Sequence, residues 1–168
     1  MLDNHAKLVQ FFSVAESVTG RKKLQKMIYI LQKCNIPFEE KYNFHFYGPY
    51  SEELTLRIEE LCNLGFLNEV KEDKSNYYQY NYRITSDGKD FLQQFGLDMP
   101  DYQIKVDKLK SRSSRFLELV ATMFYFDDLP MEETIEKVRT VKAKQKYSDE
   151  EIQDAIQFIN ELKDPVTQ

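Results

Sequence analysis

The residue types that most often do chemistry in enzymes are present in this sequence, but their spacing does not assemble a catalytic site. Glu39 is followed directly by Glu40, and Asp127 by Asp128. Neighbours on a chain seldom face each other, so neither pair is placed like the opposed carboxylates of an acid–base mechanism. The sequence also contains no Gly-x-Ser-x-Gly motif, P-loop or dinucleotide-binding fingerprint. We therefore expect a protein that is not an enzyme and has no catalytic residues.

Cysteine and histidine, the usual ligands of structural zinc, are equally sparse. Cys34 and Cys62 are far apart along the chain, as are His5 and His45. A zinc site normally uses closely spaced pairs such as Cys-x-x-Cys or His-x-x-x-His, and neither spacing occurs. The sequence therefore predicts no metal and no cofactor. It predicts two reduced, half-buried thiols, because disulfides are rare in the cytosol.

Basic side chains that could contact phosphate groups gather in three segments of an acidic chain, whose formal net charge is −5 at pH 7. Proteins that coat nucleic acid are usually basic overall, so a contact here needs a local basic patch. The segments contain Arg21, Lys22, Lys23, Lys26 and Lys33; Lys105, Lys108, Lys110, Arg112 and Arg115; and Lys137, Arg139, Lys142, Lys144 and Lys146. Each could be an ordinary solvated helix face. Alternatively, two segments converge and hold nucleic acid or a partner through Arg21, Lys22, Lys23, Lys26, Lys108, Lys110, Arg112 and Arg115.

Aromatic residues form a second group of candidates, either for the core or for a partner-binding surface. Tyr78, Tyr80 and Tyr82 alternate with polar residues, which is typical of a half-buried strand. The full set is Phe46, Tyr47, Gly48, Pro49, Tyr50, Tyr78, Tyr80 and Tyr82. Cross-strand packing would explain these residues, but tyrosine is also enriched at the energetic centres of protein interfaces. One face of the tyrosine strand then needs a cover, which the C-terminal helices or a second subunit of a homodimer could supply.

The periodicity of apolar side chains indicates the elements that must position these residues. Helical spacing predicts helices over residues 3–18, with Asp3 as the N-cap, over 21–34, and over 51–64, with Ser51 as the N-cap. Each predicted helix has one apolar face, so the three can pack together around a core.

Shorter elements lie between and after these helices. Phe44 and Phe46 alternate with a polar residue and predict a short extended segment, followed by a turn at Gly48 and Pro49. Two strands, residues 66–70 and 78–84, then form a hairpin with a polar tip, and Thr85 caps a further helix. The rest of the chain is helical: an apolar stripe from Leu109 to Met123, a helix that starts at Pro130, and a third that opens with the capping box Ser148-x-x-Glu151.

The order helix, helix, helix, strand, turn, strand, helix resembles the winged-helix regulators. The most specific residues are Leu61 to Leu67, where Gly65 ends a helix, and Tyr82 to Leu92, where Thr85 ends a strand and caps the next helix. The resemblance implies a fold that is mainly α with a small β-hairpin. We expect a winged-helix domain at residues 1–97 and a helical C-terminal region at 101–168 that packs on it.

A closer resemblance involves residues 20–29, Gly-Arg-Lys-Lys-Leu-Gln-Lys-Met-Ile-Tyr, and residues 44–51, Phe-His-Phe-Tyr-Gly-Pro-Tyr-Ser. Together they look like the YwgA-like proteins of Gram-positive bacteria, a family without an assigned activity. More distantly, residues 23–29 and the Tyr-Gly-Pro step at 47–49 are similar to the Panacea antitoxin domain. The chain departs from that domain after Pro49, where it reads Tyr-Ser-Glu-Glu. The closer resemblance implies a shared fold.

The third predicted helix is the one that enters the major groove in a winged helix that reads DNA. Its charged residues here are Glu52, Glu53, Arg57, Glu59 and Glu60, a net negative face that repels phosphate. The sequence therefore leaves two functional classes open for a non-catalytic regulatory protein. One is a DNA-associated transcriptional regulator, and the other is a protein-interaction or antitoxin-like adaptor that does not read DNA through this helix.

We also expect a cytoplasmic protein without a membrane anchor. No apolar run approaches the roughly 20 residues that a membrane-spanning helix needs. The first residues, Met-Leu-Asp-Asn-His, lack the basic and then apolar pattern of a signal peptide. Partners in solution would then be proteins, a second copy of the chain, or nucleic acid, the last of which the charge does not favour.

Overall fold

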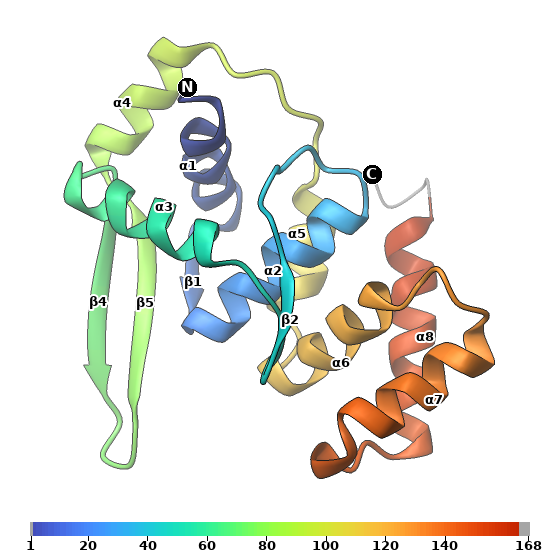
Figure 1. Ribbon diagram of the computed structural model, residues 1–168. Coiled ribbons are helices and arrows are strands. Elements are labelled where there is room, and N and C mark those ends of the chain that lie inside the picture. Colours follow the sequence, from blue (N-terminus) through green and yellow to red (C-terminus); the bar gives the residue numbers. More distant parts are fainter. Residues whose placement is uncertain (1, 165–168) are drawn as a thin grey trace.

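The computed structural model describes residues 2–164, which form eight α-helices and two small antiparallel sheets (Figure 1). The predicted class, mainly helical with a small β component, is confirmed. None of the helices in this part of the chain is long and apolar enough to cross a membrane. The last four residues of the predicted C-terminal region, 165–168, lie outside the described residues.

The first part of the chain alternates helices with short strands. Its elements are α1 (Asp3–Ala15), β1 (Ser17–Thr19), α2 (Arg21–Lys33), β2 (Asn43–His45), β3 (Gly48–Tyr50), α3 (Glu52–Asn63), β4 (Leu67–Asp73), β5 (Tyr78–Ile84) and α4 (Ser86–Phe95). The second part is helical throughout. It contains α5 (Gln103–Lys110), α6 (Ser114–Tyr125), α7 (Met131–Val141), a 3₁₀ turn (Ala143–Gln145) and α8 (Asp149–Lys163).

The larger sheet has the strand order β1-β5-β4, and all its pairings are antiparallel. The predicted hairpin is present, with Leu67 opposite Ile84 at its base. In Figure 1 this hairpin extends away from the helices, while α7 and α8 lie on the opposite side of the molecule. Strand β1 was not predicted: its Val18 pairs with Tyr82 of β5, and the prediction of a helix through residue 18 is therefore wrong. Helix α1 ends because Glu16 adopts a positive φ of 67°, which no α-helix continues.

Three of the predicted helix starts are confirmed by hydrogen bonds at the cap. The hydroxyls of Ser51 and Thr85 accept from the backbone N–H groups three residues later. Ser148 and Glu151 form the predicted capping box, in which each side chain accepts from the other residue's backbone N–H. The predicted cap at Asp3 is wrong: Leu2 holds that position, and Asp3 lies in the first turn, where its charge suits the helix dipole.

The second small sheet, β2 and β3, is a hairpin within the long connection between α2 and α3. Strand β3 was predicted as a turn, but Pro49 can pair here because it lies opposite Phe44 in a two-stranded sheet that needs no second partner. Two glutamines of α2, seven residues apart, hold this connection in place. Gln25 exchanges two hydrogen bonds of 2.9 Å with the backbone of Ser51. Gln32 does the same with Glu40, at 2.9 and 3.0 Å.

The junction between the hairpin and α4 explains the Thr-x-x-Gly step of the sequence. The Thr85 hydroxyl donates to the Gly65 carbonyl at 2.5 Å and accepts from the Gly88 N–H at 3.0 Å. A side chain at Gly88 would collide with the Phe66 carbonyl oxygen, so this position requires glycine because of a close approach between α4 and the start of β4.

Both parts of the chain share one hydrophobic core. Every residue of α2 from Leu24 to Leu31 is buried, and so is every residue of α6 from Phe116 to Phe124. These two helices pack against each other; α5 packs on α2, α8 packs on α6, and α1 packs on α5. The C-terminal helices therefore cover the N-terminal part rather than forming a separate body. The proposed boundary near residues 97–101 stays a prediction.

Candidate functional site

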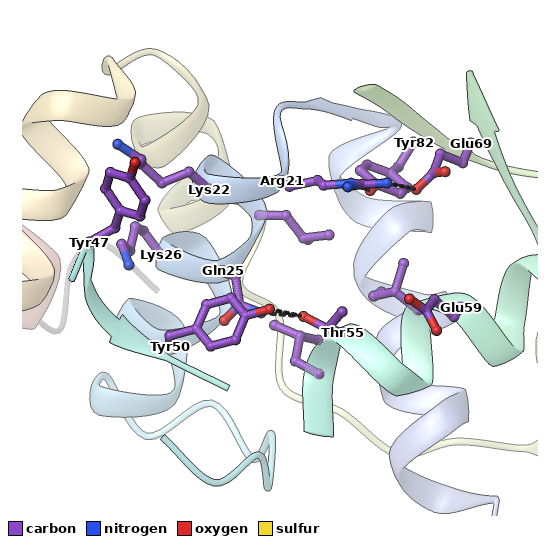
Figure 2. A pocket seen from close by; sticks show the side chains of 13 residues that line it. Arg21, Lys22, Gln25, Lys26, Tyr47, Tyr50, Thr55, Glu59, Glu69 and Tyr82 are labelled. Carbon is purple, nitrogen blue, oxygen red and sulfur yellow. Dashed lines mark hydrogen bonds and ion pairs between the residues drawn. The ribbon is translucent and has the colours of Figure 1, made fainter. Parts of the chain in front are cut away.

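A cavity of about 570 Å³ lies where α2, α3, the β2–β3 hairpin and the larger sheet meet (Figure 2). Cavities of roughly 300–1,000 Å³ are typical of small-molecule sites. Its lining combines apolar, aromatic and charged groups: Arg21, Lys22, Leu24, Gln25, Lys26, Tyr47, Tyr50, Leu54, Thr55, Ile58, Glu59, Glu69 and Tyr82. The cavity thus brings together one predicted basic segment, at the start of α2, with several of the predicted aromatic residues.

The polar groups in the middle of the cavity are held in place by one another. The Gln25 side-chain amide donates to the Thr55 hydroxyl at 3.0 Å, in addition to its bonds with Ser51. The Tyr50 hydroxyl lies 2.8 Å from the Thr55 hydroxyl, as the dashed line in Figure 2 shows. Because each group already has a partner, this part of the wall is preorganised and keeps its shape when the cavity is filled.

Arg21 closes the cavity on the side of the sheet. Its Nε donates to the Tyr82 hydroxyl at 3.2 Å, and its guanidinium lies 3.6 Å from a Glu69 carboxylate oxygen. The same guanidinium stacks 3.6 Å above the centre of the Tyr80 ring. Burial and the neighbouring Glu69 raise the pKa of the Tyr82 hydroxyl, so it remains protonated and available as a hydrogen-bond partner.

Three lysines surround a single carboxylate at the other end of the cavity. Glu118 of α6 is 1% exposed; its two oxygens lie 3.4 Å from Lys22 Nζ and 3.1 Å from Lys142 Nζ. Lys26 is also only 1% exposed and Lys142 only 4%. Their ammonium groups hold the tip of the β2–β3 hairpin: Lys26 donates to the Pro49 carbonyl at 2.7 Å, and Lys142 to the Phe46 carbonyl at 2.9 Å.

The balance of charges in this lysine cluster affects the pKa of Lys26. Burial lowers the pKa of the Lys26 ammonium to about 8, and the positive charges of Lys142 and Lys22 act in the same direction. Glu118 opposes the shift without cancelling it. Lys26 is therefore a buried cation whose positive charge is not fully balanced by the negative charge around it.

The Tyr-Gly-Pro step of the sequence lies directly on this cluster. Gly48 has a φ of +87°, which favours glycine, and a side chain here would press on the Thr122 hydroxyl of α6 and contact Glu118. Phe46 and Tyr47 form the turn between β2 and β3 and are exposed, with their rings 5.0 Å apart. Lys22 lies 4.3 Å from the centre of the Tyr47 ring.

The predicted nucleic-acid contacts mostly have protein partners in the structure. The α2 and α5 segments do meet, because Lys23 donates to the Lys110 carbonyl at 2.7 Å and Lys110 donates to the Ala15 carbonyl at 2.7 Å. Three others form ion pairs with residues of α8: Lys108 with Glu161, Arg112 with Asp154, and Arg115 with Glu151. As a set they are therefore less available to phosphate than the sequence alone suggests.

The predicted tyrosine strand spreads from the core to solvent. Tyr82 is buried against Phe12 of α1, Tyr80 is half-buried beneath Arg21, and Tyr78 is exposed beside Lys71. Core packing thus explains Tyr82, and a partner-binding role for the exposed Tyr78 stays a prediction. A cover from the C-terminal helices was one alternative, but α1 and α2 cover the buried end instead.

Residues that the sequence reasoning missed are Glu118, Gln25 and the pair Glu40 and Arg57. Glu118 stands inside the unbroken buried stretch of α6, and a lone acid within an apolar helical run could have drawn attention to it. Its partners come from α2 and the end of α7, so no local spacing could have identified them. Lys142 was assigned to a basic segment as one charge among five.

The outward face of α3 is acidic and apolar. Glu52, Leu56, Glu59 and Glu60 are exposed along it. Leu56 is 57% exposed, and Leu64 just after the helix is exposed to the same degree. The one cation of the helix, Arg57, is turned inward, where it pairs with Glu40 and with Glu53 at 3.2 Å.

Comparison with known proteins places this architecture in a family. No protein-family model matches the chain. The chain is 62% identical, over 97% of its own length and 98% of the relative's, to a protein described as the uncharacterised protein YwgA of Bacillus subtilis (strain 168). At this level of identity over nearly the whole of both chains, the protein belongs to the YwgA-like family of bacterial proteins.

Proposed function

We propose that the protein is a non-catalytic regulatory adaptor that binds another protein, built on a winged-helix unit at residues 1–97. The order α1-β1-α2-α3-β4-β5, with the β2–β3 hairpin inserted between α2 and α3, supports the winged-helix assignment. The β4–β5 hairpin is then the wing and β1 the third strand of its sheet. In this assignment α3 is the helix that a DNA-reading relative would place in the major groove. A cytoplasmic location belongs to the proposal, and both cysteines are free thiols, as a reducing compartment requires.

The outward face of α3 is the observation that carries the proposal. Nucleic-acid affinity comes largely from cations that neutralise phosphates. This face presents Glu52 and Glu60, with Glu59 at its edge beside the cavity, and it has no outward cation. Leu56 and Leu64 lie among these acids, each more than half exposed. Apolar residues ringed by charge are typical of a surface that packs on another protein. The matching partner surface is an apolar groove with basic residues at its rim.

A DNA-binding titration distinguishes this adaptor from a DNA reader. We expect fluorescence anisotropy with a random-sequence duplex at 100 mM salt to show that the native protein lacks the affinity of non-specific binders, whose dissociation constants are on the order of micromolar. Reversing two charges with Glu52→Lys and Glu60→Lys, neither of which lines the cavity, should create measurable, salt-sensitive affinity. The matched control is Glu132→Lys with Glu133→Lys, the same change on the exposed first turn of α7. The adaptor role would be contradicted if the native protein binds the duplex tightly and neither double variant changes that affinity.

One observation favours a second candidate, a DNA-associated protein that uses another face. Lys23 and Lys110 lie in contact, so the two basic segments form one continuous surface. Binding through this surface would weaken steeply as salt rises, and Lys23→Gln with Lys110→Gln would reduce the slope. A flat salt titration of the native protein removes this candidate.

A further inference from the structure

The lysine cluster beneath the β2–β3 hairpin contains an imbalance of buried charge. Within the described part of the chain, Glu118 is the one carboxylate that forms an ion pair with Lys22 or Lys142. Lys26 forms no ion pair there and has the Pro49 carbonyl as its hydrogen-bond acceptor. An ammonium group has three N–H donors, and the bond to Pro49 is the one side-chain hydrogen bond of Lys26 among the described residues. Burying cations without matching anions is costly, so the site is suited to receive a negative group.

The cavity beside these lysines has charged groups at its two ends and apolar surface between them. Figure 2 shows the ends of Lys22 and Lys26 beside the Tyr47 ring, with Glu59 and Glu69 at the opposite end. Between the ends lie Leu24, Leu54 and Ile58, and the Tyr50 ring. A molecule that fits must therefore carry one anionic group at one end and a flat or apolar body behind it.

We propose that this cavity binds a small aromatic carboxylate, with its anionic group held by Lys22 and Lys26 and its ring against Leu24, Leu54, Ile58 and Tyr50. The volume of about 570 Å³ is ample for a molecule of one to three rings. The inference goes beyond the adaptor role, because the cavity lies on the inner side of α3 and its occupation does not involve the exposed Leu56 or Glu60. A ligand here contacts α2, α3 and the hairpin together, and so joins three elements of the winged-helix unit.

The carboxylate should bind more weakly as Lys26 loses its proton. With the pKa of Lys26 near 8 in the empty cavity, the protonated fraction falls about tenfold between pH 7 and pH 9, and the affinity should fall in proportion. The charged groups that face Lys26 are Glu118 of α6, Lys142 at the end of α7 and Lys22 one turn earlier on α2. Of the three, only Lys22 has a substantially exposed side chain.

Calorimetric titration with 2-naphthoate and with its neutral counterpart 2-naphthalenemethanol tests the site. We expect saturable one-to-one binding of 2-naphthoate, about tenfold tighter than the alcohol, since the carboxylate accepts charge-assisted hydrogen bonds that the neutral alcohol does not. Lys22→Gln, at the rim, should weaken the carboxylate about fivefold and leave the alcohol unchanged. Lys26→Met should weaken it at least about tenfold and remove the dependence on pH between 7 and 9.

The matched control is Lys89→Gln, which removes an exposed lysine of α4 that lies outside the cavity. It should leave both affinities unchanged. If Lys26→Met fails to fold, Lys22→Gln and the pH series on the native protein still decide. Absence of 2-naphthoate binding, equal affinity for acid and alcohol, or an affinity that neither Lys22→Gln nor the pH series alters would overturn the proposal. None of these results bears on DNA binding by α3, so the adaptor role is judged separately.

Discussion

Replacing Glu118 with alanine is expected to lower the free energy of unfolding by about 3–5 kcal/mol at pH 7, the usual cost of breaking a buried ion pair from one side. The substitution leaves Lys26 and Lys142, which are 1% and 4% exposed, without their buried counter-charge. It also opens space beneath Gly48, whose hairpin rests on the Glu118 side chain. Urea denaturation followed by circular dichroism measures the loss.

Two comparisons separate the charge of Glu118 from its volume. Glu118→Gln keeps the size of the side chain and removes its charge, so it should lose most of the same stability. Glu132→Ala, which removes an exposed acid of α7, should change stability by less than about 0.5 kcal/mol. A loss of under about 1 kcal/mol for both Glu118 variants would mean that the lysine cluster does not depend on this carboxylate.

The same cluster gives the native protein a distinctive response to alkaline pH. The pKa of Lys26 is lowered from 10.5 to about 8, so between these values the unfolded chain binds more protons than the folded one. Stability from this group therefore rises as pH increases from 8 to 10.5, by up to about 3 kcal/mol. The loss of stability caused by Glu118→Ala should become smaller over this pH range, because Lys26 becomes neutral when it loses a proton and then needs no counter-charge. The rise should be absent from Lys26→Met.

Replacing Arg57 with alanine is expected to cost about 3–5 kcal/mol at pH 8 and clearly less at pH 5. Arg57 is the cation paired with Glu40, whose side chain is 1% exposed. Burial raises the pKa of Glu40 to about 7 against the opposing effect of Arg57. A carboxyl with a raised pKa stabilises the fold fully below its unfolded value near 4.5, and this contribution is lost as pH rises through 7. At pH 8 the variant must therefore either bury an ionised and unpaired Glu40 or protonate it at a cost in free energy, whereas at pH 5 the group is already protonated.

The control for Arg57→Ala is Glu53→Gln, which removes the second carboxylate near Arg57, at 3.2 Å, and leaves the pair with Glu40 intact. It should change stability by less than about 1 kcal/mol. Denaturation of both variants at pH 5 and pH 8 makes the comparison. Equal losses for Arg57→Ala at the two pH values would show that the charge of Glu40 is not what Arg57 compensates.

The parts of the fold that the sequence predicted are those with local signals. Strand β5 was predicted with its observed bounds because Tyr78, Tyr80 and Tyr82 repeat with period two. The caps at Ser51, Thr85 and Ser148 were also predicted, because a capping side chain and the backbone N–H that donates to it are three residues apart. Strand β1 was missed because it has three residues and pairs with β5 more than 60 residues later. The cap at Ser113, which divides the predicted stripe from Leu109 to Met123 into α5 and α6, lies among several serines and was not distinguished.

The candidate site was predicted only in part, for a physical reason. Composition and spacing identified Lys22, Lys26 and Tyr47 as members of basic and aromatic segments. They could not show that Lys26 is buried, because a lysine in a basic segment is ordinarily solvated. The burial follows from α6, which approaches α2 from a region about 90 residues later and brings Glu118 with it. Long-range packing of this kind leaves no periodic signature in one sequence.

Photo-crosslinking from α3 tests most directly the central claim, that its outward face binds protein rather than DNA. A benzophenone amino acid is placed at Leu56 and, as a control, at Met131, an apolar residue of α7 that is also about half exposed. Irradiation in living bacterial cells should give a discrete protein adduct from position 56, which Leu64→Asp abolishes, and none from position 131. Nucleic-acid adducts from position 56, or the same protein adducts from both positions, would contradict the claim.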